Sequence, residues 1–311
     1  MEVSVIIAAH NPDRGRLRRT LAGIRAQTLA SAAFETILVD NASREPLAQA
    51  NLAESAPANL RVVVEPQLGL TAARRRGFSE ARAPLCVLVD DDNVLAPDYL
   101  ARSLRLAGRH ERVGAFGGRS LPEFEVEPPA WAREFFPLLA LRDHGDASHF
   151  EEGLRAPGAA RNRYPAEAAP IGAGMVLRRA AAQTWMSEGS ATLSDRRGTE
   201  LTSGGDNDIV LTTLKHGWAV AYFPELSLLH LIPAGRLAPE YLARLNHGIQ
   251  KSWMQVLSRH DANPWPPIAR ASVPLRQCKA WFTHRAWASP AARIRWQGAC
   301  GHFEGRVLPA A

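Results

Sequence analysis

Short apolar runs alternate with amphipathic segments over the first 110 residues of the chain. Four runs have the length and composition of buried strands: residues 3–10, 34–43, 60–66 and 84–93. Three segments place apolar residues at helical spacing: residues 14–27, 69–81 and 97–110. A regular alternation of strands and helices is typical of a parallel sheet flanked by helices, so the pattern predicts an α/β fold with a largely parallel sheet.

The pattern weakens between residues 120 and 170, where proline, glycine, charged residues and scattered aromatics replace the periodicity. A stretch of this length without regular elements is typical of a functional lid or binding segment, with poor packing or disorder as the alternative. Order returns near residue 170. Residues 203–233 predict a glycine turn, a helix and a strand that ends at His230, and residues 240–260 predict a further helix.

Three of the four early strands end in polar side chains: His10 and Asn11, Asp40 and Asn41, and Asp90 to Asn93. Ligands of open α/β sheets bind outside the carboxyl ends of the strands, so we expect these side chains to face one crevice. Any one of them alone would be more typical of a turn. The three consecutive aspartates repel one another, and a metal ion, a sugar hydroxyl or both would compensate their charge.

The C-terminal part of the chain carries the positive charge. The net charge of the 311 residues is +6, yet residues 241–311 hold ten Lys or Arg against two acidic residues, together with five of the eight tryptophans. Basic residues and tryptophans together suit an anionic bilayer surface, so peripheral membrane docking is one interpretation. A basic extension that packs on the rest of the protein is the other. No nucleic-acid-binding motif is present, and we expect no nucleic-acid partner.

The remaining composition predicts a cytoplasmic protein, with the inner face of the membrane as a peripheral location. No apolar run approaches the roughly 20 residues of a transmembrane helix, and the first residues lack the basic start of a signal peptide. Cys86, Cys278 and Cys300 lack the spacing of zinc ligands, which favours a reducing compartment.

Seven motifs follow one another between residue 3 and about residue 250: VSVIIAAHN, ILVDNAS, GLTAARRRG, VLVDDDNVLAPDYL, IGAGMVLRR, SGGDNDIVL and HLIPAGRL. In this order and spacing the chain resembles family 2 of the glycosyltransferases, of bacterial type, which are inverting enzymes with the A-type glycosyltransferase (GT-A) fold. The resemblance implies a catalytic domain over residues 1–240, with a nucleotide-binding half over 1–119 and an acceptor and donor-sugar half over 120–240. Residues 241–311 would form a basic, Trp-rich helical extension.

The resemblance also implies which residues bind the nucleotide: Ala8, His10, Asn11, Asp40, Asn41, Arg74, Asp90 and Asp91. The carboxylate of Asp40 would accept the imide N–H of uracil or a comparable donor on guanine. Arg74, near a helix start, would contact the diphosphate. Asp90 would touch the ribose.

Asp92 and His230 would hold a divalent metal ion, either Mn²⁺ or Mg²⁺. Imidazole suits Mn²⁺ better than Mg²⁺. Asp206 would be the general base that deprotonates the acceptor hydroxyl, with Asp208 as the rival. The family usually has Glu-Asp where this chain has Gly205-Asp206. Residues near the donor sugar and acceptor would be Gly172, Ala173, Gly174, Gly205, Asp208 and Trp131.

The resemblance therefore implies transfer of a sugar from a nucleoside-diphosphate sugar, by family frequency a UDP-sugar, to a hydroxyl of a saccharide or lipid-linked acceptor. Synthesis of cell-envelope polysaccharide or glycolipid is the expected role. Two alternatives remain open: a nucleotide-binding scaffold subunit without transfer activity, and a nucleotidyltransferase. The chain has only a poor version of the glycine- and arginine-rich loop that nucleotidyltransferases carry after the first strand.

Overall fold

The computed structural model describes residues 1–47, 52, 54–155, 161–188 and 201–307. Within these residues a sheet of nine strands has the order β3-β2-β1-β4-β8-β6-β9-β5, and β7 pairs with β9. The strands are β1 (Val3–Ala9), β2 (Phe34–Asn41), β3 (Leu60–Glu65), β4 (Leu85–Asp90), β5 (Asn93–Leu95), β6 (Val113–Phe124), β7 (His149–Glu151), β8 (Val176–Arg178) and β9 (Ala219–Ile232). The helices are α1 (Arg14–Arg25), α2 (Leu70–Glu80), α3 (Tyr99–Arg109), α4 (Arg179–Ser187), α5 (Gly205–Lys215), α6 (Pro239–Arg259), α7 (Val273–Thr283) and α8 (Pro290–Gly305).

The first four strands are parallel, as the alternating pattern predicts. Their register aligns the carboxyl ends, because Ala9 of β1 lies opposite Asp40 of β2 and Ala8 lies opposite Asp90 of β4. Strand β8 pairs antiparallel with β4, and β6 pairs antiparallel with β8. The fold is therefore α/β with a mostly parallel central sheet, and the prediction of fold class is confirmed.

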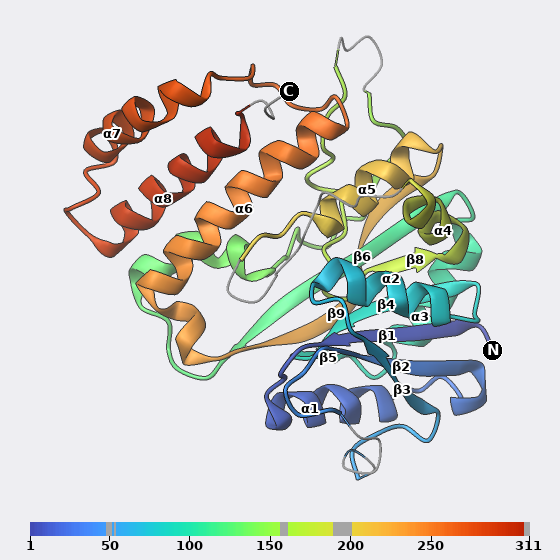
Figure 1. The fold of residues 1–311 in the computed structure, drawn as a ribbon. Helices are drawn as coiled ribbons and strands as arrows, with labels where there is room; N and C mark the ends of the chain where they lie inside the picture. The colour runs from blue at the N-terminus through green and yellow to red at the C-terminus, as the bar shows by residue number, and fades with distance from the viewer. Residues whose placement is uncertain (48–51, 53, 156–160, 189–200, 308–311) are drawn as a thin grey trace.

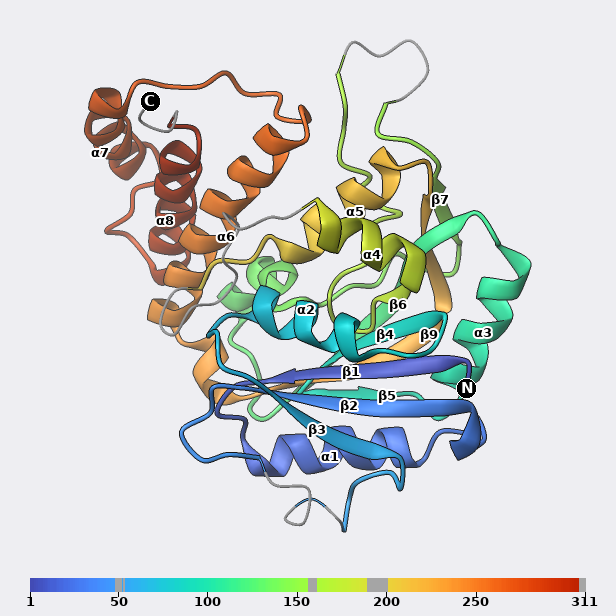
Figure 2. The same ribbon diagram turned by 45° about the vertical axis from the view of Figure 1, so that its right-hand side comes forward.

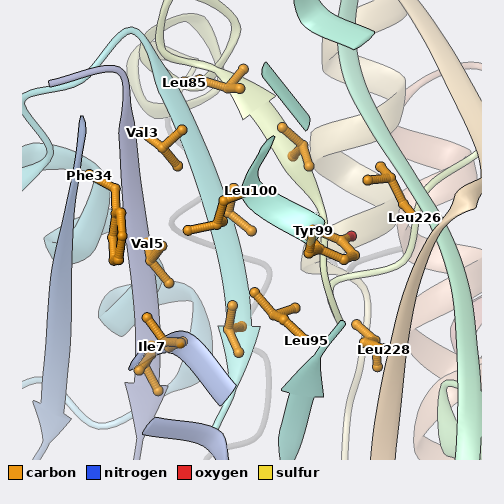
Figure 3. Packing of buried hydrophobic residues seen from close by; sticks show 14 of the residues in the cluster. Val3, Val5, Ile7, Phe34, Leu85, Leu95, Tyr99, Leu100, Leu226 and Leu228 are labelled. Carbon is orange, nitrogen blue, oxygen red and sulfur yellow. The ribbon is translucent and has the colours of Figure 1, made fainter. Parts of the chain in front are cut away.

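Helices cover both faces of the sheet (Figures 1 and 2). Apolar side chains of α1 and α3 pack on one face against β1 and β4, and those of α2, α4 and α5 pack on the other. Figure 3 shows the first of these clusters, in which Val3, Val5 and Ile7 point from β1 toward Leu95, Tyr99 and Leu100. The periodic leucines of the early sequence are thus core residues. Their packing holds the helices on the sheet whose carboxyl edge carries the polar strand ends.

Strand β6 runs into the stretch from residue 120 that the sequence pattern assigns to loops. It pairs in parallel with β9 as far as Phe124, with a register shift between Gly117 and Arg119. A Cβ atom on Gly118 would lie 2.1 Å from the carbonyl oxygen of Leu226, so glycine is what allows β9 to approach here. Between β6 and β8 the described regular elements are a 3₁₀ segment, η3 (Ala130–Leu139), and the short strand β7, and residues 156–160 lie outside the described part.

The last helices form a layer beside the sheet domain, with α8 packed along α6 and α7 outside it (Figure 1). Glycines bring α8 close to α6: a Cβ atom would lie 2.1 Å from the carbonyl oxygen of His247 if built on Gly301, and 2.4 Å from that of Lys251 if built on Gly305. The proposed boundary between residues 240 and 241 falls within α6. Among the described helices, none combines the length and the apolar character needed to cross a bilayer.

Candidate active site

A cavity of about 500 Å³ opens at the carboxyl edge of the parallel strands. Eleven residues that the sequence assigns to the site line it: Ala8, His10, Asn11, Asn41, Arg74, Asp90, Asp91, Asp92, Ala173, Asp206 and His230. Six assigned residues do not line it: Asp40, Gly172, Gly174, Gly205, Asp208 and Trp131. Residues from β1, α2, β4, α5 and β9 thus meet in one space although they lie far apart in the chain.

The end of β1 is held by hydrogen bonds to the end of β2. His10 Nδ1 lies 2.7 Å from the carbonyl oxygen of Asn41, and His10 Nε2 lies 2.8 Å from Asn11 Nδ2. Asn41 in turn donates to the carbonyl oxygens of Glu65 and Gln67, and it accepts from the backbone N–H of Gly69. This amide therefore fixes the turn that leads into α2, which carries Arg74.

Asp40 is buried, and its carboxylate faces its own loop. Oδ1 accepts from the backbone N–H of Ser43 at 3.2 Å, and Oδ2 accepts from that of Leu47 at 2.9 Å. These are the contacts of an aspartate that orders a turn. Its nucleobase contact stays a prediction, and the geometry here gives Asp40 a second role in shaping the loop after β2.

Arg74 joins two carboxylates across the cavity. Its side chain is 4% exposed, Nη1 donates to Asp206 Oδ1 at 2.6 Å, and Nη2 lies 3.8 Å from Asp90 Oδ1. The second oxygen of Asp206 accepts from the backbone N–H of Gly172 at 2.8 Å. A Cβ atom on Gly172 would lie 2.2 Å from Arg74 Nη2, so only glycine leaves room for this pair. The loop of the IGAGM motif is therefore part of the site through its backbone.

The aspartates that follow β4 interact with different groups. Burial, together with the neighbouring carboxylates of Asp92 and Asp90, raises the pKa of Asp91 to about 7. Asp92 is buried; its Oδ1 lies 3.3 Å from His230 Nε2 and accepts from Asn93, and its Oδ2 accepts from Arg236 Nη2 at 2.8 Å. Strand β5 creates this proximity, because Asn93 lies opposite His230 in its pairing with β9.

The spacing of Asp92 and His230 fits a divalent ion. Metal–ligand bonds of about 2.1 Å place neighbouring octahedral ligands about 3 Å apart, which is close to the observed 3.3 Å between Asp92 Oδ1 and His230 Nε2. Among the described residues no group of three or more His, Cys, Asp or Glu could hold a metal. Mg²⁺ and Mn²⁺ commonly use one or two protein ligands and complete their shell with substrate phosphate and water, so two ligands suffice.

Asp208 lies apart from the cavity, in the protein core. Its Oδ2 accepts from Trp185 Nε1 and its Oδ1 from His260 Nε2, both at 2.8 Å, and Arg259 Nε lies 3.5 Å from Oδ1. The carboxylate thus links α5 to α4 and to the end of α6. Of the two aspartates at the start of α5, Asp206 is the one that faces the cavity.

The other assigned residues lie outside the cavity lining. Gly174 has φ +77°, and its carbonyl oxygen accepts from the hydroxyl of Tyr99 at 2.5 Å. Gly205 is the first residue of α5. Trp131 belongs to η3, where its ring lies 6.4 Å from that of Phe135. Their contacts with sugar stay predictions.

Three arginines in the cavity wall, Arg16, Arg142 and Arg236, have no role in the sequence analysis. Arg142 donates to the carbonyl oxygen of Ala169, and burial lowers its pKa. Arg236 pairs with Asp92, and the acidic cluster raises its pKa although burial opposes this. Arg142 lies in the segment without periodicity, so no pattern singles it out. Arg236 is within the motif HLIPAGRL, where the histidine alone receives a role in the sequence analysis.

Comparison with solved structures defines the class. The mannosyltransferase PcManGT from Pyrobaculum calidifontis, solved in complex with GDP-Man and Mn²⁺, matches 94% of this chain and 73% of its own, with a TM-score of 0.57 and 19% identity. TarS 1-349 of S. aureus matches 98% of this chain and 90% of its own, with a TM-score of 0.54 and 12% identity. At these identities the likeness establishes the fold, which is that of the GT-A glycosyltransferases.

The chain belongs to glycosyl transferase family 2, whose model matches residues 4–185. The succinoglycan biosynthesis protein ExoW of Rhizobium meliloti (strain 1021) is 30% identical over 114 residues, which is 35% of this chain and 35% of that protein. The putative glycosyltransferase EpsH of Bacillus subtilis (strain 168) is 30% identical over 109 residues, 34% of this chain and 30% of that protein. The chain thus spans about a third of the length of the curated relatives it matches. The family prediction is confirmed.

Proposed function

We propose that this protein is an inverting glycosyltransferase that moves a sugar from a nucleoside-diphosphate sugar to an acceptor hydroxyl. The observation that carries the proposal is the meeting of the polar end of β1, the aspartate run after β4 and Asp206 in one cavity. A donor nucleotide needs polar groups and a cation beside its phosphates, and inversion needs one carboxylate facing the acceptor. The cavity wall contains each of these groups.

In the proposed reaction Asp206 takes the proton of the acceptor hydroxyl. The acceptor oxygen bonds to the anomeric carbon as the bond from that carbon to the diphosphate oxygen breaks. Arg74, which hydrogen-bonds Asp206 and lies near Asp90, holds the diphosphate on the donor side and orients the base. The backbone N–H of Gly172 holds the second oxygen of Asp206.

Asp92 and His230 would hold the divalent ion, Mn²⁺ or Mg²⁺. When bound there it supplies positive charge to the diphosphate as that group leaves. The Mn²⁺ in the complex of the mannosyltransferase PcManGT supports this assignment. That complex contains GDP-Man, so both guanine and uracil nucleotides are candidate donors. The name of the rhizobial relative, a succinoglycan biosynthesis protein, supports a role in polysaccharide synthesis, with a saccharide as the acceptor that we propose.

The exposed surface of α7 supports a membrane partner for the C-terminal helices. On α7, Leu275 and Phe282 are 75% and 63% exposed, and Trp287, in the turn after the helix, is 56% exposed. Arg276 and Lys279 are exposed on the same segment. Apolar side chains beside basic ones suit an anionic bilayer surface, where each nearby cation contributes on the order of 1 kcal/mol. The occupant that we propose for this surface is an anionic membrane.

Calorimetric titration of UDP, GDP and dTDP, each with and without Mn²⁺, tests the donor site. We expect one nucleotide to bind in a metal-dependent way and to lose this binding in Asp92→Ala. Asp206→Asn should retain nucleotide affinity and lower sugar transfer by about 10²- to 10⁴-fold, the usual contribution of a general base. Asp98→Asn, at an exposed ion pair on α3, is the matched control. If no nucleotide binds with metal, the proposed function fails; if a nucleotide binds and Asp206→Asn transfers sugar normally, the base assignment fails.

Co-sedimentation with vesicles of anionic and of neutral lipid tests the membrane proposal. Because α8 packs tightly on α6, point variants are preferable to a truncation. The double variant Phe282→Ser and Trp287→Ser should bind anionic vesicles less than the natural protein does. Equal binding by both proteins, or equal binding to neutral vesicles, would rule the proposal out.

A further inference from the structure

Arg236 lies on the two side chains that are proposed as metal ligands. It belongs to a 3₁₀ segment, η4 (Ala234–Leu237), that directly follows β9. Its Nη2 lies 2.8 Å from Asp92 Oδ2, and its Nη1 lies 3.4 Å from His230 Nε2. The side chains of Asp92 and His230 are 5% and 3% exposed, whereas that of Arg236 is 22% exposed and lines the cavity. The guanidinium is therefore the group of this trio that is closest to solvent.

A divalent ion and this guanidinium compete for the pair in the observed geometry. Coordination requires the Nε2 lone pair of His230 and an oxygen of Asp92, and Arg236 lies against both groups. Two cations on one carboxylate in a buried site also repel each other strongly, since water screens them poorly. A metal ion that binds Asp92 and His230 must therefore move the guanidinium aside.

A displaced guanidinium would find an anion of matching chemistry in the diphosphate of the donor. Arginine presents a planar fork of N–H donors that pairs with phosphate oxygens. Arg236 belongs to η4 and Arg74 belongs to α2, so the two arginines reach the cavity from different elements. A diphosphate that arrives with the metal would give Arg236 a new anionic partner at the moment when it loses Asp92.

We infer that Arg236 is a built-in cation that competes with the divalent metal for Asp92 and His230 and turns to the donor's diphosphate once the metal is bound. The inference rests on the proposed function and deepens it, because it makes metal and donor bind together. Without nucleotide, Arg236 opposes the metal. With nucleotide, Arg236 strengthens donor binding.

The test measures Mn²⁺ alone and nucleotide with Mn²⁺ on Arg236→Gln. Free Mn²⁺ followed by electron paramagnetic resonance gives the metal affinity without any nucleotide. We expect Arg236→Gln to bind Mn²⁺ about tenfold or more tightly than the natural protein does, since one charge-assisted hydrogen bond no longer competes. With saturating Mn²⁺, the same variant should bind the nucleoside diphosphate about tenfold more weakly. A structural role alone would not shift the two affinities in opposite directions.

Two further variants make the measurement specific. Arg105→Gln removes an exposed ion pair with Glu225 and should leave both affinities unchanged. Arg236→Lys keeps the charge and should give metal affinity between those of the natural protein and Arg236→Gln, and it serves as the test protein if Arg236→Gln does not fold. Thermal unfolding of each variant reports its folding.

The outcomes separate this inference from the proposed function. If the natural protein binds nucleotide with metal and Arg236→Gln gains no Mn²⁺ affinity, the inference is wrong and the proposed function stands. If Arg236→Gln binds both Mn²⁺ and nucleotide more tightly, the contact with the diphosphate is wrong. If no variant binds Mn²⁺ or nucleotide, both the inference and the proposed function are wrong.

Discussion

Replacing Asp208 by asparagine tests whether the second carboxylate of α5 is structural rather than catalytic. The side chain is 1% exposed and accepts hydrogen bonds from Trp185 and His260, with Arg259 nearby. Asparagine has nearly the same shape, so the substitution leaves no cavity. It removes the negative charge and replaces one acceptor oxygen by an N–H group.

The magnitude follows from these contacts. One of the two donors, Trp185 Nε1 or His260 Nε2, would face the new amide N–H and lose its partner. A hydrogen bond to a charged group contributes about 1.5 to 3 kcal/mol, and a buried donor left without a partner costs a further 1 to 3 kcal/mol or so. We expect the free energy of unfolding to fall by about 3 to 5 kcal/mol, the range for breaking a buried charged pair.

Urea denaturation followed by tryptophan fluorescence measures this loss. Asp98→Asn, at an exposed pair with Arg102, should change the free energy of unfolding by less than about 1 kcal/mol. Under conditions in which it is folded, Asp208→Asn should transfer sugar at nearly the natural rate. If Asp208→Asn instead keeps its stability within about 1 kcal/mol and loses transfer about 100-fold, then Asp208 acts in catalysis and our assignment of the base is refuted.

Two further predictions concern a glycine and the cysteines. Gly172→Ala should abolish most sugar transfer, because the new Cβ atom would displace the pair of Arg74 and Asp206. The control Gly108→Ala, on a helix with open space around it, should leave the free energy of unfolding unchanged or raise it by about 0.5 to 1 kcal/mol. Normal transfer by Gly172→Ala in a kinetic assay would contradict the geometry. Burial raises the pKa of Cys86 to about 12 and that of Cys300 to about 11, so both thiols stay protonated at pH 8 and react only as the pH approaches those values. A thiol reagent at pH 8 should therefore label the exposed Cys278 first, and rapid labelling of a second cysteine in the folded protein would show the prediction to be wrong.

The polar strand ends could be predicted from sequence because parallel strands impose their own geometry. An apolar run that ends in polar residues marks the carboxyl end of a buried strand, and neighbouring parallel strands end at one edge. The register that aligns Ala8 with Asp90 follows from that rule. Local pattern therefore sufficed for the strand-end residues that line the cavity, which are His10, Asn11, Asn41, Asp90, Asp91 and Asp92.

Contacts between distant segments could not be read from local pattern. Gly118 and Pro122 are typical of loops, yet both lie in β6, where Pro122 pairs with His230 of β9 and Gly118 lies at a register shift between the two strands. The partners of Asp208 and Asp92 lie 52 and 144 residues away, at His260 and Arg236. An aspartate near a helix start can cap the helix, act as a general base or form a buried hydrogen bond between elements. Its distant partner shows which of these roles it has.

The glycine contacts between α8 and α6 also bear on how the protein is made. Helix α6 contributes Ile249 to the cavity wall, and α8 packs along the other side of α6. Because the close approach at Gly301 and Gly305 allows few alternative registers, α6 gains its full support only when α8 is present. On the ribosome, the residues up to 305 must therefore emerge from the exit tunnel before this wall is secured, so a nascent chain acquires its parallel strands early and its complete cavity late.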